Sequence, residues 1–298
     1  MGLSQGYGSA DDTESIAAIH AALDAGVTLL DTAISYGQGH NEALVGRAIA
    51  SSGVPRDNLQ VATKFGIVRG DHGVHLDAHP DRIAGYCDES LHRLGTETID
   101  LYYLHRVDPQ VPIEESIGAM SELVSQGKVR HLGVSEVTAD QLRRAHAIHP
   151  IAAMQFEWSL MWREPEVNIV PAARQLGVGL VPYSPLGRGL LGGSLNTTSV
   201  AESPFRANDP RFNGSSLTVN MRQVDALASF ARSRSMTVAQ LALAWLLAQG
   251  DDVVPIPGTR NAQRAQENAA AMRYHLEAED LAALESVVPA NGWVGDRQ

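Results

Sequence analysis

Short apolar runs alternate with amphipathic segments along the whole chain. The apolar runs are largely continuous, which is typical of parallel strands covered on both faces. Strands are expected at 27–30, 59–64, 98–104, 129–134, 152–157, 178–183 and 252–256. Helical periodicity predicts helices at 13–25, 40–50, 80–94, 113–127, 138–148, 165–176, 218–249 (with a break near 235–237) and 261–272.

The alternation of strand and helix predicts an α/β fold with a parallel sheet, and at this length the natural candidate is a (β/α)8 TIM barrel. The regular spacing, without a linker, predicts a single domain over residues 1–298. The eighth strand should precede the helix at 13–25, where only a short, turn-rich stretch remains. We therefore expect the first barrel strand to be truncated or missing at the N-terminus.

Composition narrows the classes of partner. The chain has 23 Lys and Arg against 34 Asp and Glu, a net charge of −11, which disfavours nucleic acid and anionic membranes but allows a small phosphorylated ligand. Cys87 is the single cysteine, so no internal disulfide can form and a cytoplasmic location fits best. No segment approaches the roughly 20 apolar residues of a membrane span. The sequence leaves the oligomeric state open.

Polar side chains stand at the ends of three successive predicted strands. Asp31 and then Tyr36 follow the first, Lys64 ends the second and His105 ends the third. In a (β/α)8 barrel the working residues lie at these C-terminal ends, so the four side chains should share one rim. Each alone also fits a structural role as a helix cap or a solvated charge, but together they favour catalysis.

The four residue types suit one kind of chemistry. A free phenol is a poor acid near neutral pH, and a nearby ammonium such as that of Lys64 favours the phenolate form. Asp31 could hold Lys64, and His105 could donate a hydrogen bond to a carbonyl oxygen. Tyr36 would then give a proton to an oxygen that gains negative charge. A hydride source is lacking among these residues, so a cofactor is required.

Seven stretches resemble motifs of the aldo-keto reductase family, in order and with the family's spacing. They are GVTLLDTAISYG, ATKFG, DLYYLHRVD, GKVRHLGVSE, MQFEWSL, VPYSPLGRGLL and IPGTRNAQRAQENAAA. The resemblance covers nearly the whole chain and is greatest to the bacterial and plant branch that resembles perakine reductase. It implies NADPH-dependent reduction of a small aldehyde or ketone, with no metal, and a catalytic tetrad of Asp31, Tyr36, Lys64 and His105 in which Tyr36 is the general acid.

The resemblance also implies the cofactor residues. Ser135 and Gln155 match the residues that bind the nicotinamide carboxamide, and Tyr183 matches the aromatic residue that stacks under the ring. The segment along the pyrophosphate corresponds to Ser184, Pro185, Leu186, Gly187, Arg188 and Gly189. The adenosine end corresponds to Gly258, Thr259, Arg260, Arg264, Glu267 and Asn268.

Physical reasoning agrees at the adenosine end. Thr259 and Arg260 lie just before a predicted helix, where free N–H groups and the helix dipole favour a phosphate. Arg260 and Arg264 could clamp a 2′-phosphate, which favours NADPH over NADH.

Two positions depart from the family pattern. Glu136 stands where the family often has Asn; because some relatives also have Glu, we expect activity to be kept. The chain begins MGLSQGYG, as though entered partway through the first barrel strand, which would put Met1 and Gly2 near the cofactor. We hypothesise that Met1 is an internal methionine of a longer chain, and an intact mass of the native protein matching 298 residues would count against this.

Other features allow two interpretations each. The stretch DHGVHLDAHP, with His72, His75 and His79, could bind a metal, but its pattern favours a polar loop, which could line the mouth of the substrate site. Residues 203–212 suit either a flap or a surface excursion. Trp158 and Trp162 suit either a substrate wall or core packing, and Cys87 is expected to pack. As an alternative function, potassium-channel β subunits also resemble this family, which would make the chain a nucleotide-sensing regulatory subunit with little turnover.

Overall fold

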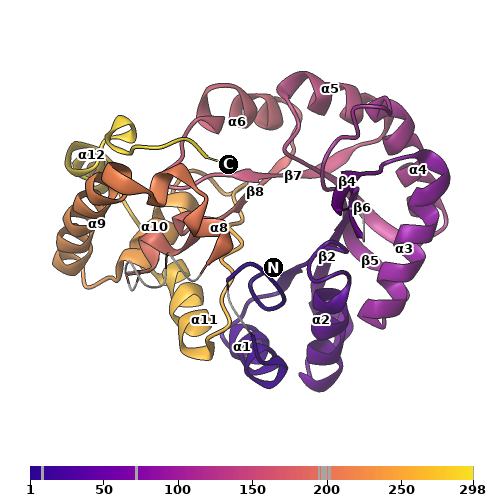
Figure 1. Cartoon of the computed structure of the whole chain (residues 1–298), viewed down its shortest axis with the longest axis horizontal. Coiled ribbons are helices and arrows are strands. Elements are labelled where there is room, and N and C mark those ends of the chain that lie inside the picture. Colours follow the sequence, from indigo (N-terminus) through magenta and orange to yellow (C-terminus); the bar gives the residue numbers. More distant parts are fainter. Residues whose placement is uncertain (8–9, 71–72, 194, 196–199, 201–202, 298) are drawn as a thin grey trace.

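The computed structural model describes residues 1–7, 10–70, 73–193, 195, 200 and 203–297, and contains a six-stranded sheet (Figure 1). All neighbouring strands are parallel, so their C-terminal ends meet on one rim. In spatial order the strands are β1 (Leu29–Asp31), β2 (Gln60–Phe65), β5 (Ile99–Leu104), β6 (Val129–Ser135), β7 (Ile151–Glu157) and β8 (Gly179–Tyr183).

The predicted strand at 252–256 lies beside β8 but forms only an isolated bridge, between Val253 and Leu180. The Val254 N–H donates to the Leu180 carbonyl (2.8 Å), and the Ile256 N–H donates to the Pro182 carbonyl (3.1 Å). Pro255 and Pro257 have no N–H, which limits further pairing. Residues 1–7 form turns and bends, so the described residues contain no first barrel strand, as expected from the sequence.

Helices surround the sheet in Figure 1, and the labels of both chain ends lie inside their ring. Six helices follow the first turns of the chain: α1 (Asp12–Asp24), α2 (His40–Ser51), α3 (Pro80–Leu94), α4 (Ile113–Ser125), α5 (Ala139–Ile148) and α6 (Pro165–Gln175). Beyond β8 come α8 (Pro204–Ala207), α9 (Gly214–Ser233), α10 (Val238–Leu247), α11 (Ala262–Ala269) and α12 (Ala278–Val287). The predicted break in the long helix thus separates α9 from α10.

Short 3-10 segments complete the chain. They are η1 (Arg56–Asn58), η2 (Gly187–Gly192), η3 (Pro210–Phe212), η4 (Ala270–Arg273) and η5 (Ala290–Gly292). Of these, η2 and η3 belong to the long connection after β8 and lie close to the rim of the sheet.

The core has two parts. A large cluster fills the space between the sheet and the helices, and a small one, Ala62, Tyr103, Ala153 and Val181, lies inside the curved sheet. Gly133 makes room for the Tyr103 ring, because a Cβ atom there would lie 2.5 Å from two ring carbons. The interior of the sheet is therefore packed, and chemistry is confined to the rim.

The polar loop expected around residues 71–79 is partly wrong. An antiparallel hairpin of β3 (Ile67–Gly70) and β4 (Gly73–Leu76) occupies this region. Asp77 pairs with Arg82 (2.5 Å), and His79 caps the N-terminus of α3. Asp71 and His72 lie outside the described residues, and within the described ones no group of three His, Cys, Asp or Glu could hold a metal ion.

No helix among the described residues is both long and apolar enough to cross a bilayer. Cys87 is fully buried in α3, and burial raises the pKa of its thiol to about 12. The expectation that Cys87 packs in the core is confirmed.

Candidate active site

Asp31, Tyr36, Lys64 and His105 converge at the rim of the sheet. The Lys64 ammonium, fully buried, donates to Asp31 Oδ1 and to the Thr32 carbonyl (2.8 Å). Its Nζ lies 5.1 Å from the centre of the Tyr36 ring. The Tyr36 and His105 rings meet edge to face, with centroids 5.8 Å apart and an interplanar angle of 84°. A phenol thus lies between an ammonium and an imidazole.

The electrostatics of the site keep Lys64 charged and His105 neutral. Burial lowers the pKa of Lys64, but Asp31 and Tyr36 outweigh it and raise that pKa above its ordinary value. Burial, followed by the positive charges of Lys64, Arg106 and Arg69, lowers the pKa of His105 well below its ordinary value. A neutral imidazole keeps one N–H donor and one acceptor nitrogen.

One ring nitrogen of His105 lacks a hydrogen-bond partner among the described residues. This nitrogen, Nδ1, is buried. The backbone N–H of the same residue is held by the Phe65 carbonyl at 2.8 Å. A buried nitrogen without a partner is costly, so this arrangement suits a site that a ligand completes.

Gln155, which was expected at the nicotinamide carboxamide, binds a residue of the tetrad directly. Its side-chain N–H donates to Asp31 Oδ2 at 2.9 Å, while Lys64 uses Oδ1. Both oxygens of Asp31 are therefore held. Gln155 is almost fully buried on β7, and its carbonyl oxygen is left to accept another hydrogen bond.

The N-terminal residues reach the same place. Burial, with the Lys64 charge next, lowers the pKa of the Met1 amino group to about 5, which puts Met1 beside the tetrad. The side chain of Gln5 accepts the Gly37 N–H (3.0 Å), so this segment holds the loop that carries Tyr36. Gly2 lies next to Tyr7, since an added Cβ would lie 3.4 Å from the Tyr7 ring.

The residues expected around the nicotinamide lie at the ends of β6, β7 and β8. Ser135 is buried, and its hydroxyl accepts from Arg106 (3.2 Å). Tyr183 ends β8 and is half-buried. Ser135, Gln155 and Tyr183 thus lie on three neighbouring strands of one rim.

Glu136 takes part in an ion pair that the sequence did not reveal. Burial raises the pKa of its carboxyl group, but Arg297 outweighs this and lowers it, with two bonds of 2.9 and 2.5 Å. Arg297 also lies 3.4 Å from the Tyr183 hydroxyl and 5.6 Å from the centre of the Trp162 ring. The departure at Glu136 therefore has a partner in the C-terminal segment.

The two tryptophans differ in their surroundings. Trp158 is buried between Phe156 and Trp245, with ring centroids 6.0 Å away in each case, and its indole N–H donates to Glu166. Trp158 is thus part of the core. Trp162 is half-buried beside Arg297 and stays a candidate for the wall of a substrate site.

The segment expected along the pyrophosphate makes a sharp turn after β8. Ser184 and Arg188 have left-handed backbones, with φ of 49° and 53°. Gly189 is also left-handed, with φ of 99°, a conformation that favours glycine, and a Cβ there would lie 2.7 Å from a guanidinium nitrogen of Arg206. Pro185 and Leu186 lead into η2, which begins with Gly187, Arg188 and Gly189 and in which Leu190 and Leu191 are buried.

Arginines gather around this turn and the start of α11. Burial, and after it the charges of Arg260 and Arg264, lower the pKa of Arg206, which puts these three guanidinium groups within electrostatic range of one another. Gly258 and Thr259 lead into α11, where the Asn261 side chain accepts the Arg264 N–H (2.9 Å). Asn268 is buried and Glu267 half-buried one turn further on. The cluster fits an anion with several phosphates.

Comparison with known proteins agrees with this geometry. The sequence model of the aldo/keto reductase family matches residues 1–289. The chain belongs to the aldo/keto reductase family. It is 44% identical over 299 residues to a probable aldo-keto reductase 1 of Glycine max, with 100% of this chain and 86% of the relative covered.

Solved structures place the fold of this aldo/keto reductase in the same family. A glycerol dehydrogenase from Gluconobacter oxydans superposes with a TM-score of 0.87 at 32% identity, over 97% of this chain and 91% of that one. An aldo/keto reductase from Klebsiella pneumoniae, solved with NADP and acetate, gives a TM-score of 0.74 at 28% identity, over 99% and 90%. The predicted barrel class is confirmed, while the perakine-reductase-like branch stays a prediction.

Proposed function

We propose that this aldo/keto reductase reduces an aldehyde or ketone to an alcohol with NADPH. The observation that supports this most directly is the contact of Tyr36 with both the Lys64–Asp31 ion pair and the neutral His105. These groups can give a proton to a carbonyl oxygen and stabilise the charge that develops on it. We also infer that residues 1–298 act as one catalytic domain in the cytoplasm.

Each member of the tetrad has a separate task. The charged Lys64 favours the phenolate that Tyr36 becomes after it gives up its proton. Asp31, held by Lys64 and Gln155, fixes the ammonium and offsets its charge. Neutral His105 orients the carbonyl oxygen through an N–H, without competing as an acid. Tyr36 is then the general acid.

The residues present fit a dinucleotide. Arg206, Arg260 and Arg264 lie within electrostatic range of one another and Arg206 also contacts Arg188, which suits phosphates. At the rim, His105 Nδ1 has no partner among the described residues and the Gln155 carbonyl oxygen can accept a hydrogen bond. NADPH would be held by Ser135, Gln155 and Tyr183 at its nicotinamide, by residues 184–189 at its pyrophosphate, and by residues 258–260, 264, 267 and 268 at its adenosine. When bound, it supplies the hydride.

Replacing Tyr36 with Phe tests the proposal. We expect turnover of a panel of aldehydes to fall by about 100-fold or more, the range for loss of a general acid or base, with little change in NADPH binding. Turnover is followed by the near-ultraviolet absorbance of reduced nicotinamide, and binding by fluorescence. Tyr274→Phe is the matched control, because that hydroxyl donates to the Ser235 carbonyl (3.1 Å) in a different part of the molecule.

The outcomes separate the two candidate functions. Turnover that persists in Tyr36→Phe would contradict the assignment of the general acid. A wild-type protein that binds NADPH but reduces none of the carbonyl compounds would favour the nucleotide-sensing regulatory subunit instead.

A further inference from the structure

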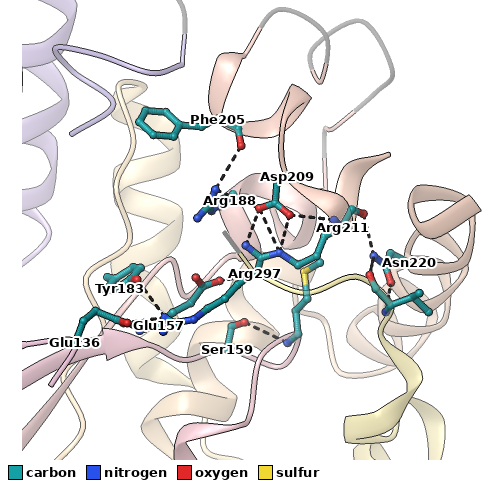
Figure 2. A network of polar contacts seen from close by, with 12 residues as sticks. Glu136, Glu157, Ser159, Tyr183, Arg188, Phe205, Asp209, Arg211, Asn220 and Arg297 are labelled. Atoms are coloured by element: carbon teal, nitrogen blue, oxygen red, sulfur yellow. Dashed lines mark hydrogen bonds and ion pairs between the residues drawn. The ribbon is translucent and has the colours of Figure 1, made fainter. Parts of the chain in front are cut away.

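An ion-pair network of four side chains, Glu157, Arg211, Asp209 and Arg188, extends from the end of β7 to the turn after β8 (Figure 2). Arg211 Nη1 donates to Glu157 at 2.5 Å, and Arg211 Nε and Nη2 bind Asp209 at 3.0 and 2.7 Å. Asp209 Oδ2 is also 3.1 Å from Arg188 Nη1. Glu157 and Asp209 are fully buried and Arg211 is 1% exposed. Negative and positive side chains alternate along this ion-pair network, so each buried charge has a neighbour of opposite charge.

This ion-pair network holds residues 203–212 against the rim of the sheet. Phe212 is buried, and the Asn220 side chain donates to the Arg211 carbonyl at 3.0 Å. Gly295 passes so close that a Cβ there would lie 2.8 Å from the Arg211 backbone nitrogen. Of the two interpretations of this segment, a surface excursion does not fit, because Asp209 and Arg211 are buried and paired and Arg206 is half-buried.

Arg188 is held at one end only. Within the described part of the chain, its side-chain contacts go through Nη1, to Asp209 and to the Phe205 carbonyl (3.3 Å). Its carbonyl oxygen accepts from Arg206 Nε at 2.8 Å, which fixes the strained backbone of the turn. The planar guanidinium is therefore oriented while Nε and Nη2 remain for a ligand.

We propose that Asp209 is a positioning residue for Arg188: it aims the guanidinium at the dinucleotide's phosphates, and Glu157 and Arg211 hold Asp209 in place. This rests on the proposed function, in which Arg188 meets the pyrophosphate. Docking of residues 203–212 would then complete the phosphate site rather than only cover it. Asp209 itself need not touch the cofactor.

A double-mutant cycle on NADPH affinity tests the inference. Arg188→Ala and Asp209→Asn should each weaken binding, by about 3- to 100-fold, the range for coupled neighbours. The double variant should bind no more weakly than Arg188→Ala, because Asp209 acts through Arg188. Asp225→Asn, on the exposed side of α9, is the matched control and should bind as the wild type does.

A fragment separates positioning from general damage. Adenosine 2′-monophosphate carries the 2′-phosphate but neither phosphate of the pyrophosphate, so its affinity should be unchanged in Asp209→Asn. Equal losses for NADPH and the fragment, or independent effects of the two substitutions, would overturn the inference in favour of a purely structural role.

Arg188→Lys keeps the inference testable if Asp209→Asn does not fold. Lysine retains the charge but loses the planar fork, so its affinity for NADPH should fall nearly as far as that of Arg188→Ala. A lysine variant with wild-type affinity would overturn the need for an oriented guanidinium. If Arg188→Ala binds NADPH normally, the inference fails, whereas carbonyl reduction by the wild type would leave the proposed function standing.

Discussion

Arg211→Met should destabilise the protein strongly. The substitution keeps much of the side-chain volume but removes the cation between Glu157 and Asp209, both fully buried. Removing one partner of a buried ion pair typically costs about 3–5 kcal/mol, because the remaining charge has lost its compensation. Two carboxylates lose a partner here, although Asp209 keeps Arg188, so we expect a loss near the upper end of that range.

The expected shift of the melting temperature follows from the size of the chain. With an unfolding entropy of about 2.1 cal/mol/K per residue, a loss of about 5 kcal/mol lowers the melting temperature by about 8 °C. Urea denaturation followed by circular dichroism gives the free energy, and calorimetry gives the melting temperature. Arg222→Met is the matched control, since Arg222 is exposed on α9 and its replacement should change stability by no more than about 0.5 kcal/mol.

A second variant tests the reason for the loss. Replacing Arg211 with Met, Asp209 with Asn and Glu157 with Gln together removes the isolated charges. This triple variant should be more stable than Arg211→Met alone, because neutral groups cost less to bury than unpaired charges. A single variant that loses less than about 1 kcal/mol, or a triple variant that is no more stable than the single one, would refute the electrostatic explanation.

Two further predictions concern the rim. Because the pKa of His105 is lowered in the folded protein, only the unfolded chain takes up a proton at this residue just below pH 6.5. The free energy of unfolding should therefore be full above that pH and fall by up to about 1.4 kcal/mol by pH 5.5. Urea titrations at both pH values should show that His105→Gln loses this part of the pH dependence. Glu136→Gln and Arg297→Ala should each lower the free energy of unfolding by about 1–2 kcal/mol in dilute buffer and by less in 1 M salt. The double variant should lose no more stability than either single variant, and additive losses would mean that the pair does not act as a unit.

The meeting of Asp31 and Lys64 was predictable because strand geometry determines it. Asp31 lies opposite Ala62 in the parallel register of β1 and β2, so Lys64, two residues further, points to the same face. Its long side chain then reaches back to the carboxylate. The same alternation puts Glu157 on the face of Gln155, which could have marked Glu157 as a rim residue. Periodicity does not extend to Tyr36, whose loop is held by Gln5 and the other N-terminal residues.

The β3–β4 hairpin was missed because its pattern lacks a buried face. Val74 is 58% exposed and Leu76 is 38% exposed, and histidine lies between them. A strand is recognised from sequence when one face is apolar and the other polar, and this hairpin presents neither arrangement to the core. The helices were predictable for the opposite reason: α3, for example, buries Ile83, Cys87 and Leu94 and ends at Gly95 with φ of 64°.

The failures at the rim share one physical cause. Glu136 pairs with Arg297, which lies 161 residues away in the sequence, and Glu157 pairs with Arg211, which lies 54 residues away. Local sequence patterns cannot predict pairs at such separations. A carboxylate at a strand end reads from sequence as a ligand contact or a solvated charge. Burial decides between these and a third possibility, an ion pair, because an acid that loses water must gain a cation. The family's Asn at position 136 could contact a carboxamide directly, whereas Glu136 is engaged by Arg297, so its effect on the cofactor should pass through Tyr183, which Arg297 also touches.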